Sequence, residues 1–391
     1  MKIYNYLRFL SSLSFNRSLS FLSYLKTNDK TDVLIYYPQH FSYQTKNHLL
    51  LSTLIESLDN NGLISLVIEE PKIDNKKKQS KDVISFDFIW FLVIVLRKFY
   101  KGKNYNKIDI KIGKLLSTFF GIKRDVKNII TISQSFQSIF KGMFPKAILY
   151  DYQHGLISSK YYGYINGNSV AEHILNNQSN VLVYGQGFRN KLLSLDRGEY
   201  FREHSFVIGS IYENYSKPKK TFNGNILYTL QFTKSHSKEF NDLLLEKTIE
   251  CFDKIKSNKL EIVLYLKEHP RFENCLETDI LHEYDFVKCA PHNLNDCFNL
   301  CSLHMTEYSS VVFDSLKAGI PTVLTAFTKE MDIYENEYHF PSDKISLINN
   351  FKKIKDDSFY KKMISKQIKW SKEFYEPFNE KYFIELIKYN D

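Results

Sequence analysis

Charged and hydroxyl side chains border apolar segments at two places in the second half of the chain. The apolar run 262–266 ends in Lys-Glu-His-Pro-Arg at 267–271, and Thr-Glu-Tyr-Ser-Ser at 306–310 precedes an apolar helix that ends in a Gly-Ile-Pro turn at 319–321. Ligands of open α/β sheets bind beyond the carboxyl ends of the strands. A helix N-terminus that carries hydroxyl groups also attracts anions, because its N–H groups have no partner within the helix. The two segments therefore predict a site for a phosphorylated donor.

His269 is the strongest candidate for contact with that phosphate. Lys267 and Arg271 flank its imidazole with positive charge, and Pro270 ends the strand and stiffens the chain that leaves it. This setting suits a leaving phosphate whose negative charge grows during the reaction, because the charge can be stabilised electrostatically or by proton donation.

The segment 306–310 carries groups that can complete such a donor site. Ser309 and Ser310 could bind the same phosphate, although serine is also an ordinary cap for a helix N-terminus. Glu307 could accept hydrogen bonds from ribose hydroxyls, and its alternative role is that of a surface acid.

Two further strand exits lie in the first half of the chain. Asp-Tyr-Gln-His-Gly at 151–155 follows the apolar run 147–150. A histidine beside glycine at a strand end, here His154, can reach a ligand and act as a general base near neutral pH. A purely structural turn is the equal alternative for this segment. Gly209 and Ser210 follow another apolar run, and glycine there permits close approach of the backbone to a ligand.

Signatures of metal and dinucleotide chemistry are missing from the sequence. No Asp-x-Asp triplet occurs, and Gly-Gln-Gly at 185–187 lacks the rest of a dinucleotide-binding fingerprint. The remaining histidines stand at no spacing typical of metal ligands, as is the case for His236, His282, His292, His304 and His339. We therefore expect a metal-independent reaction without a resident cofactor, in which the activated donor is a substrate.

Length and composition indicate a globular protein of two domains. The 391 residues exceed what one core usually serves, so two domains of about 150–200 residues are expected. The net charge of +9 suits an anionic partner such as a nucleotide, an acidic polymer or a lipid headgroup surface. The sequence contains no basic segment interleaved with aromatic residues of the kind that binds nucleic acid, so nucleic acid is not expected as a partner. The five cysteines have neither zinc nor disulfide spacing, which indicates free thiols in a reducing cytoplasm.

Alternating strand and helix patterns predict parallel sheets that helices cover on both faces. Apolar strands are expected at 32–37, 62–68, 147–150, 181–184, 205–208, 225–230, 262–266, 285–288 and 322–324, and the end of the chain, 358–389, is helical in character. The stretch 215–224 has the composition of a linker. We expect an N-terminal domain at 1–215, a linker at 216–224 and a C-terminal domain at 225–372.

One apolar segment, 86–96, is followed by basic residues between 97 and 103. It is shorter than the roughly 20 residues that span a bilayer, so a helix buried in the core is expected. A peripheral membrane contact is the alternative, because aromatic residues and a basic flank suit a membrane interface. The basic, apolar N-terminus has no small-residue cleavage site after it, so no signal peptide is expected.

The order of these motifs resembles the GT-B glycosyltransferases that build bacterial capsules, O-antigens and teichoic acids. Gln-His-Gly at 153–155, Lys-x-His-Pro at 267–270, and Ser-Ser at 309–310 followed by Gly-Ile-Pro at 319–321 occur in the order that such enzymes show. Two branches share these features, namely sialyl- and Kdo-transferases that use CMP-activated sugars and CDP-glycerol glycerophosphotransferases. The resemblance covers roughly residues 150–321.

The resemblance implies an α/β GT-B fold, with two Rossmann-like domains that face a central cleft and a C-terminal helix at 373–391 that crosses back to the N-terminal domain. It implies that the donor lies in the cleft, where His269 contacts its phosphate and Ser309 and Ser310 complete the site, and that the acceptor site lies mainly on the N-terminal domain. His154 resembles the proposed base of the glycerophosphotransferases. The chain reads His-Gly-Leu-Ile at 154–157 instead of that branch's His-Gly-Thr-Pro, and it lacks the acidic-acidic-Gly motif of the sialyltransferases. Asp151 is therefore a second candidate for the base.

The sequence thus predicts an inverting, metal-independent glycosyltransferase. Its expected partners are a nucleotide-sugar donor, with a CMP-sugar of the sialic acid or Kdo type favoured, and a bacterial surface glycan or lipid-linked glycan as acceptor. We expect it in the cytoplasm, with contact to the inner face of the plasma membrane. The alternatives are a CDP-glycerol or CDP-ribitol polyol-phosphate transferase and a non-catalytic nucleotide- or glycan-binding subunit of a polymer assembly complex.

Overall fold

The protein divides into two compact units in the computed structural model. The residues that the structure describes are 15–38, 51–71, 84–100, 102, 104–159, 163–167, 169–211, 216–233, 236–268, 278–325, 327–328, 333–342 and 347–389. The first unit comprises Met1–Tyr212 together with Glu376–Asp391, and the second comprises Glu213–Tyr375. In sequence, the second unit is therefore inserted between two parts of the first.

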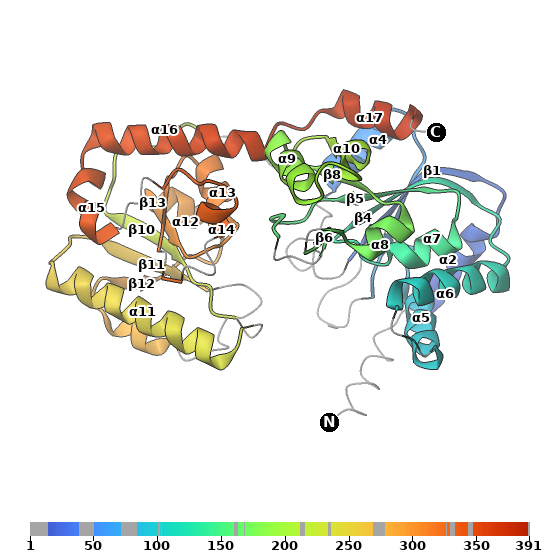
Figure 1. The fold of residues 1–391 in the computed structure, drawn as a ribbon, viewed down its shortest axis with the longest axis horizontal. Helices are drawn as coiled ribbons and strands as arrows, with labels where there is room; N and C mark the ends of the chain where they lie inside the picture. Colours follow the sequence, from blue (N-terminus) through green and yellow to red (C-terminus); the bar gives the residue numbers. More distant parts are fainter. Residues whose placement is uncertain are drawn as a thin grey trace. The chain divides into compact units, whose positions relative to one another are not determined.

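The first unit contains, within the described residues, a seven-stranded parallel sheet with the order β3-β2-β1-β4-β5-β8-β9 (Figure 1). Its strands are β1 (Lys30–Tyr37), β2 (Ser65–Glu69), β3 (Ile84–Ser85), β4 (Asp125–Ile132), β5 (Ile148–Tyr152), β8 (Asn180–Val183) and β9 (Ser205–Val207). The short strands β6 (Ile165–Asn166) and β7 (Ser169–Val170) form a separate antiparallel pair. The chain passes from β1 to β2 and β3 on one side and then returns to place β4 on the other side of β1.

Central strands of this sheet are buried on both faces, which explains their nearly continuous apolar sequences. In β1, Tyr36 is fully buried, and its ring lies 5.2 Å from that of Phe140 and 5.5 Å from that of Phe86. β4 contains a buried polar residue, Asn128, whose side-chain amide donates hydrogen bonds to the carbonyls of Asp32 and Ile387, each at 3.1 Å. These distant partners satisfy a polar group that the strand's own neighbours in sequence do not.

Helices cover both faces of the first sheet (Figure 1). In the figure α4 (Ser52–Asn60), α9 (Gln186–Leu195), α10 (Phe201–His204) and α17 (Glu380–Tyr389) lie on one side, and α2 (Phe15–Leu25), α5 (Asp87–Phe99), α6 (Tyr105–Phe120), α7 (Gln137–Met143) and α8 (Glu172–Asn177) lie on the other. α6 begins at the N-cap Asn104, whose side chain accepts a hydrogen bond from the Lys107 N–H, and ends at Gly121 in the left-handed conformation. The predicted core helix at 86–96 is present as α5, in which Ile89 and Val93 are buried.

The second unit contains a five-stranded parallel sheet in the order β12-β11-β10-β13-β14, again among the described residues. Its strands are β10 (Asn225–Thr229), β11 (Val263–Lys267), β12 (Val287–Cys289), β13 (Leu303–Thr306) and β14 (Thr322–Leu324). From β10 the chain adds β11 and β12 on one side and then β13 and β14 on the other. The direction of winding therefore reverses between β10 and β13.

The helical elements of the second unit enclose one main core cluster. They are α11 (Lys238–Ser257), the 3-10 helix η1 (Asp279–Glu283), α12 (Leu294–Leu300), α13 (Val311–Lys317), α14 (Ile333–Asn336), α15 (Leu347–Ile354) and α16 (Asp357–Phe374). Phe252 of α11 and Tyr360 of α16 are fully buried in the same cluster as Ile226 and Leu264 of the sheet. The described cysteines, Cys251, Cys289, Cys297 and Cys301, are free thiols.

The C-terminal segment returns to the first unit after α16. The Glu376 N–H donates a hydrogen bond to the Tyr184 carbonyl at 2.9 Å, and the Asn379 N–H donates one to the Ile208 carbonyl at 2.8 Å. α17 then packs in the first unit, with Phe383 and Ile387 buried. The stretch 358–389 thus contains two helices, because residues 375–379 between α16 and α17 are not helical. Two α/β units with parallel sheets and a returning C-terminal helix confirm the predicted fold class.

Candidate functional site

The carboxyl ends of β10 and β13 form the topological switch point of the second unit. In open α/β sheets, such points are where ligands bind. Side-chain hydrogen bonds join the two strands at this edge. The Thr306 hydroxyl donates one to the Thr229 carbonyl at 3.1 Å, and the Thr229 hydroxyl is hydrogen-bonded to His304 Nε2 at 3.0 Å. Burial lowers the pKa of His304 to about 3, so its ring is a neutral part of the core. The loops that leave Thr229 and Thr306 carry the candidate donor site.

His236 and Tyr308 join these two loops across the switch point. The Tyr308 hydroxyl is hydrogen-bonded to His236 Nε2, and the His236 ring also packs on Phe240 with centroids 4.7 Å apart. Both side chains are half-buried, and burial lowers the pKa of His236 and raises that of Tyr308. His236 was not among the predicted site residues, because it stands at no metal-ligand spacing. Its position shortly after the first strand of the second unit was the signal that could have found it.

Ser309 and Ser310 stand where α13 begins, but their side chains differ in role. The Ser309 hydroxyl accepts a hydrogen bond from the Val311 N–H at 3.2 Å, and the Ser309 carbonyl accepts one from Tyr334 at 2.8 Å. Ser310 is exposed and makes no side-chain cap bond with the helix. Ser309 therefore stabilises the start of α13 and its contact with Tyr334. The Ser310 hydroxyl faces solvent beside the switch point.

Glu307 has a different environment from the one expected of a ribose-binding acid. Its side chain is buried, and both carboxylate oxygens accept hydrogen bonds from the loop that follows β14. The donors are the hydroxyls of Thr325 and Thr328 and the N–H groups of Phe327 and Thr328. Four donors occupy the carboxylate, so the structure gives Glu307 the role of fixing this loop.

The Lys267 ammonium group is likewise engaged within the protein. It lies at the end of β11 and donates to the carbonyls of Pro291 at 3.2 Å and His292 at 2.8 Å, which follow β12. His269, Pro270 and Arg271 lie outside the described residues, so their contact with a donor phosphate stays a prediction. The Thr278 hydroxyl donates a hydrogen bond to Glu268 Oε1 at 2.7 Å, and these two residues stand directly before and after the segment 269–277.

The first unit has its own switch point, between β1 and β4, and the loop after β4 is held in an unusual conformation. Ser133, Gln134 and Phe136 have φ angles of 56°, 55° and 59°, in the left-handed region. Such conformations cost about 1 kcal/mol or more for each non-glycine residue and persist where surrounding contacts impose them. Asp151 of β5 supplies such contacts, because its carboxylate accepts hydrogen bonds from the Gln134 N–H at 2.7 Å and from the Thr131 hydroxyl at 2.8 Å.

Asp151 is the centre of a buried network. Its second carboxylate oxygen accepts hydrogen bonds from the Tyr164 hydroxyl at 2.6 Å and from Gln134 Nε2 at 3.4 Å. The residue has 0% exposure, and burial raises the pKa of the carboxyl group to about 6. A carboxylate without exposed surface cannot meet an acceptor hydroxyl, so in this conformation Asp151 orders the loop.

His154 is exposed in the loop that follows β5, and Gln153 fixes the shape of that loop. Gln153 is fully buried, its amide donates to the Gly155 carbonyl at 2.8 Å, and its Oε1 accepts from the Tyr184 N–H at 3.0 Å. The Tyr184 hydroxyl also donates to the Gln153 carbonyl. Of the two candidate bases, only His154 has surface that an acceptor could reach.

Gly209 and Ser210 hold the returning C-terminal segment. Gly209 has φ +85°, and a Cβ atom built on it would lie 2.6 Å from the Pro377 carbonyl carbon and 2.7 Å from the Phe378 Cα. The Ser210 N–H donates to the Glu376 carbonyl at 2.8 Å. The close backbone approach that glycine permits here is therefore made by the chain itself.

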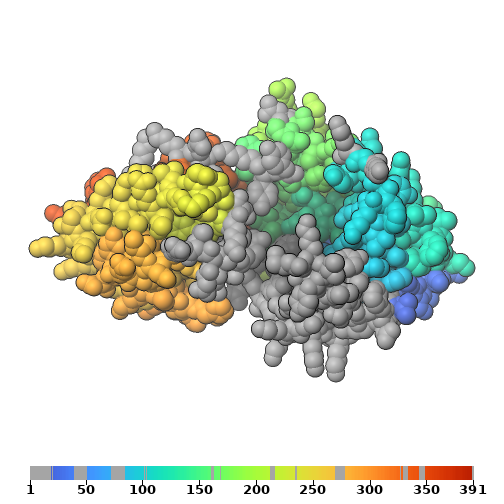
Figure 2. All heavy atoms as spheres, turned by 90° about the horizontal axis from the view of Figure 1, so that it is seen from below, coloured from blue at the N-terminus to red at the C-terminus, as the bar shows by residue number. Residues whose placement is uncertain are grey.

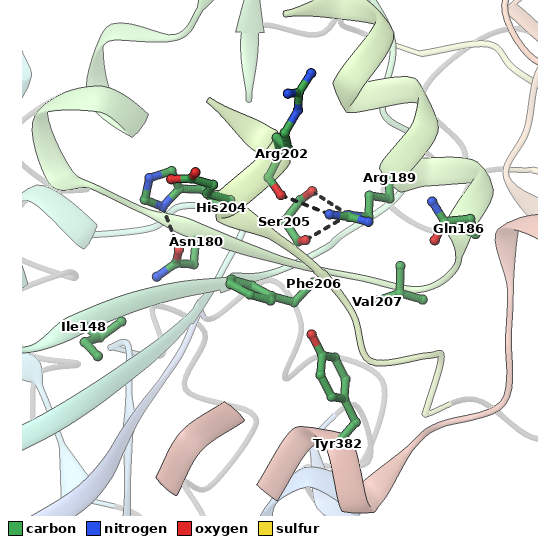
Figure 3. Close-up of a pocket in the computed structure, with 11 residues that line it drawn as sticks. Ile148, Asn180, Gln186, Arg189, Arg202, His204, Ser205, Phe206, Val207 and Tyr382 are labelled. Carbon is green, nitrogen blue, oxygen red and sulfur yellow. Dashed lines mark hydrogen bonds between the residues drawn. The ribbon is translucent and has the colours of Figure 1, made fainter. Parts of the chain in front are cut away.

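A hollow of about 680 Å³ lies at the opposite edge of the first sheet, beside the starts of β5, β8 and β9 (Figure 3). Its polar groups are largely bonded to one another. His204 Nδ1 is bonded to Asn180 Oδ1 at 2.9 Å, and the Arg189 guanidinium donates to the carbonyls of Ser205 at 3.1 Å and Arg202 at 2.9 Å. None of the predicted site residues lines the hollow, and we place the candidate site at the carboxyl edges instead.

Among the residues that the structure describes, no group of three or more His, Cys, Asp or Glu side chains could hold a metal ion. In the same part of the chain, no helix combines the length and the apolar character needed to cross a bilayer.

The fold is of the GT-B type, in which two Rossmann-like units are joined and the C-terminal helix returns to the first. UDP-GlcNAc 2-epimerase from Methanocaldococcus jannaschii superposes with a TM-score of 0.52 at 13% identity, over 92% of this chain and 99% of that one. The S. aureus MnaA–UDP co-structure gives 0.54 at 12% identity, over 93% and 97%. A variant of the wall teichoic acid polymerase TagF gives 0.50 at 12% identity, over 98% and 95%. No protein-family model and no curated protein sequence matches the chain.

Proposed function

We propose that the protein is an inverting glycosyltransferase that needs no metal ion and moves a sugar from a nucleotide-activated donor to a bacterial surface glycan. The observation that carries the proposal is the gathering of polar side chains at the carboxyl edges of the two parallel sheets. His154 is exposed at this edge of the first unit, and His236, Tyr308 and Ser310 flank the switch point of the second. Structures of the same fold that act on or contain UDP compounds, and one named as a teichoic acid polymerase, support this class.

In the proposed reaction, His154 removes the proton from an acceptor hydroxyl. The oxygen attacks the anomeric carbon in line while the bond to the donor phosphate breaks, which inverts the configuration at that carbon. His154 suits this role because it is exposed in a loop that buried Gln153 fixes, and a positioned histidine base contributes roughly 10²–10⁴-fold to a rate.

The second unit is assigned the donor. The exposed Ser310 hydroxyl and the predicted contacts of His269 and Arg271 stabilise the charge that develops on the leaving phosphate. Tyr308 and His236 are assigned to the wall of the same site, because their hydrogen bond spans the two loops of the switch point. Lys267 donates hydrogen bonds to two carbonyls and so shapes the loop after β12. Its positive charge is assigned to the same donor site.

A CMP-sugar is the donor that we propose on the motif order of the sequence, and a UDP-sugar is its direct competitor, because a structure of the same fold holds UDP. The first test is calorimetric binding of CMP, CDP, UMP, UDP and GDP, without metal and then with Mg²⁺, to wild type and His269→Ala. His282→Ala is the matched control, since His282 is an exposed histidine of the same unit. Metal-independent CMP binding that is lost only in His269→Ala supports the proposal, preference for UDP or GDP overturns the donor assignment, and no nucleotide binding refutes the function.

A UDP-GlcNAc 2-epimerase is a second candidate, favoured by the fold shared with enzymes of that name. An epimerase would convert UDP-GlcNAc when no acceptor is present, whereas a transferase consumes donor only with an acceptor or by slow hydrolysis. Incubation with UDP-GlcNAc alone, followed by separation of the sugar nucleotides, distinguishes the two.

A polyol-phosphate transferase that uses CDP-glycerol or CDP-ribitol is a third candidate. It is favoured by the fold that this chain shares with TagF. Its product would keep phosphorus in a phosphodiester, whereas a glycoside contains none from the donor. A non-catalytic subunit would bind nucleotide and leave every donor intact with every acceptor tested.

We assign the acceptor to a surface glycan that is built on a lipid carrier. Such an acceptor would place the enzyme in the cytoplasm at the inner face of the bacterial plasma membrane. There the net charge of +9 favours contact with anionic headgroups.

A further inference from the structure

The helical hairpin of α5 and α6 exposes aromatic side chains to solvent. Phe99, Tyr105 and Phe119 have relative exposures of 76%, 72% and 76%. The described residues include eleven exposed large hydrophobic side chains, and five of them, Phe99, Tyr100, Tyr105, Leu115 and Phe119, lie in this stretch of 21 residues. Single exposed apolar residues are common on proteins, but a concentration of them on one element marks an interaction surface.

Lysines share this surface of the hairpin. Lys107, Lys111 and Lys114 are exposed and follow one another at intervals of four and three residues, so they lie on one face of α6. The opposite face of α6 is in the core, where Ile112 and Leu116 are buried. The exposed face of α6 therefore presents positive charges at 107, 111 and 114, and the apolar side chains of Leu115 and Phe119 continue this face toward the end of the helix.

No exposed carboxylate of the hairpin offsets these charges. Its two acidic residues, Asp87 and Asp109, are both buried, and Asp109 accepts two hydrogen bonds from Arg97 at 2.6 and 2.8 Å. Glu172 of α8 lies 3.8 Å from Lys107 Nζ, and both side chains are largely exposed, so this pair is weak in water. Lys111 and Lys114 keep the face positive.

The hairpin arranges its aromatic rings at both ends of the lysine row. Phe88 near the start of α5 contacts Phe120 at the end of α6, with centroids 6.1 Å apart, so the two helices run antiparallel. Phe99 and Tyr105 are consequently at one end of the hairpin and Phe119 is at the other. A 16-residue helix such as α6 is about 24 Å long, so the rings stand at the two ends of a surface of about that length. Figure 2 shows the cyan atoms of the hairpin at the surface of the first unit.

We propose that the α5–α6 surface, formed by Phe99, Tyr105, Lys107, Lys111, Lys114, Leu115 and Phe119, docks the protein on an anionic lipid bilayer. The lysines are attracted by the negative surface potential, and the rings at either end enter the headgroup region, where aromatic side chains are favoured. A lipid surface suits this arrangement better than a protein groove, because the exposed side chains at 107, 111, 115 and 119 follow one another every four residues along one side of α6 instead of converging on a point. The apolar interior of α5, including Ile89 and Val93, packs in the core and takes no part.

Vesicle co-sedimentation tests this proposal. Phosphatidylcholine vesicles are compared with vesicles that also contain phosphatidylglycerol, at low and at physiological salt. Wild type is expected to bind the anionic vesicles, to release at higher salt and to bind the neutral vesicles at least tenfold more weakly. The triple variant Lys107→Glu, Lys111→Glu, Lys114→Glu is expected to lose at least about tenfold in partitioning, and Phe99→Ser with Phe119→Ser several-fold.

Two matched controls make the result specific. Lys361→Glu, Lys362→Glu and Lys369→Glu on α16 change the net charge equally at exposed positions, and Tyr389→Ser removes an exposed ring elsewhere. Both are expected to bind vesicles within about twofold of wild type. Equal losses in the α16 variant would show that net charge alone drives binding, and absence of anionic binding or equal binding to neutral vesicles would overturn the proposal. Nucleotide binding by the α6 variants is expected to be unchanged, so the donor assignment is tested separately.

Discussion

Substitution of Gly209 by alanine should loosen the attachment of the C-terminal segment to the first unit. Two effects act at this position. An alanine at φ +85° carries the left-handed penalty of about 1–2 kcal/mol. Its Cβ would also overlap the backbone of Pro377 and Phe378, and overpacking of this kind costs about 1–3 kcal/mol. The expected loss is therefore about 2–5 kcal/mol.

Gly121→Ala separates the two effects. Gly121 also belongs to the first unit and has φ +60°, but a Cβ atom there would meet nothing within 4 Å. Its expected loss is the backbone penalty alone, about 1–2 kcal/mol. The difference between the two variants, about 1–3 kcal/mol, measures the contact with the crossing segment.

Hydrogen exchange followed by mass spectrometry is the suitable assay, because a protein of two units need not unfold in one step. In Gly209→Ala, amides of α17 and of β9 should exchange about five- to 160-fold faster than in Gly121→Ala, which corresponds to about 1–3 kcal/mol. Amides of α11 in the second unit serve as the internal reference. Equal exchange of α17 in the two variants would refute the reasoning, because the overlap with Pro377 and Phe378 would then carry no energy.

Three further substitutions test the assignments at the two sheet edges. Burial raises the pKa of Asp151 in the folded state from 3.8 to about 6. Between these two pH values the folded protein binds more protons than the unfolded chain does. The free energy of unfolding should therefore fall by up to about 3 kcal/mol as the pH rises through this range. Asp151→Asn should flatten that part of the stability profile in denaturant titrations, and an unchanged slope would contradict the assignment. His154→Ala should lower the rate of transfer by about 10²–10⁴-fold while nucleotide affinity and thermal stability stay as in wild type. A loss confined to nucleotide affinity would remove His154 from its role as base. Glu307→Gln leaves the loop after β14 with one acceptor oxygen for four donors and should cost the second unit about 1–3 kcal/mol, whereas Glu261→Gln at an exposed position should change the thermal midpoint little.

The pattern of the sequence predicted most of both sheets but missed one of the two strands at each switch point. Strands such as β5, β8, β10 and β11 are short apolar runs, and the expected segments coincide with them to within two residues. β4 and β13 were not expected, because each carries a polar residue on a buried strand. Asn128 is satisfied by Asp32 and Ile387, and His304 by Thr229 and Thr322. Partners that are distant in sequence cannot be read from local periodicity.

The sequence predicted which strand ends carry the candidate residues, but not which contacts within the protein those residues make. Residue types at strand exits located the carboxyl edges, where His154 and Ser310 are exposed. The same reasoning could not tell that Asp151, Glu307 and Lys267 would be held by the protein's own donors and acceptors. Whether a charged group faces a ligand or a neighbouring loop depends on loops that follow other strands, and the sequence of one segment does not contain that information.

The insertion of the second unit between two parts of the first has a consequence for folding during synthesis. A ribosome that has made residues 1–212 has not yet made the helix that supplies the Ile387 carbonyl to Asn128. One face of the first sheet therefore stays without α17 until all of Glu213–Tyr375 has been translated. The second unit is contiguous and can complete its own core first, so the part of the protein that begins first in the chain is completed last.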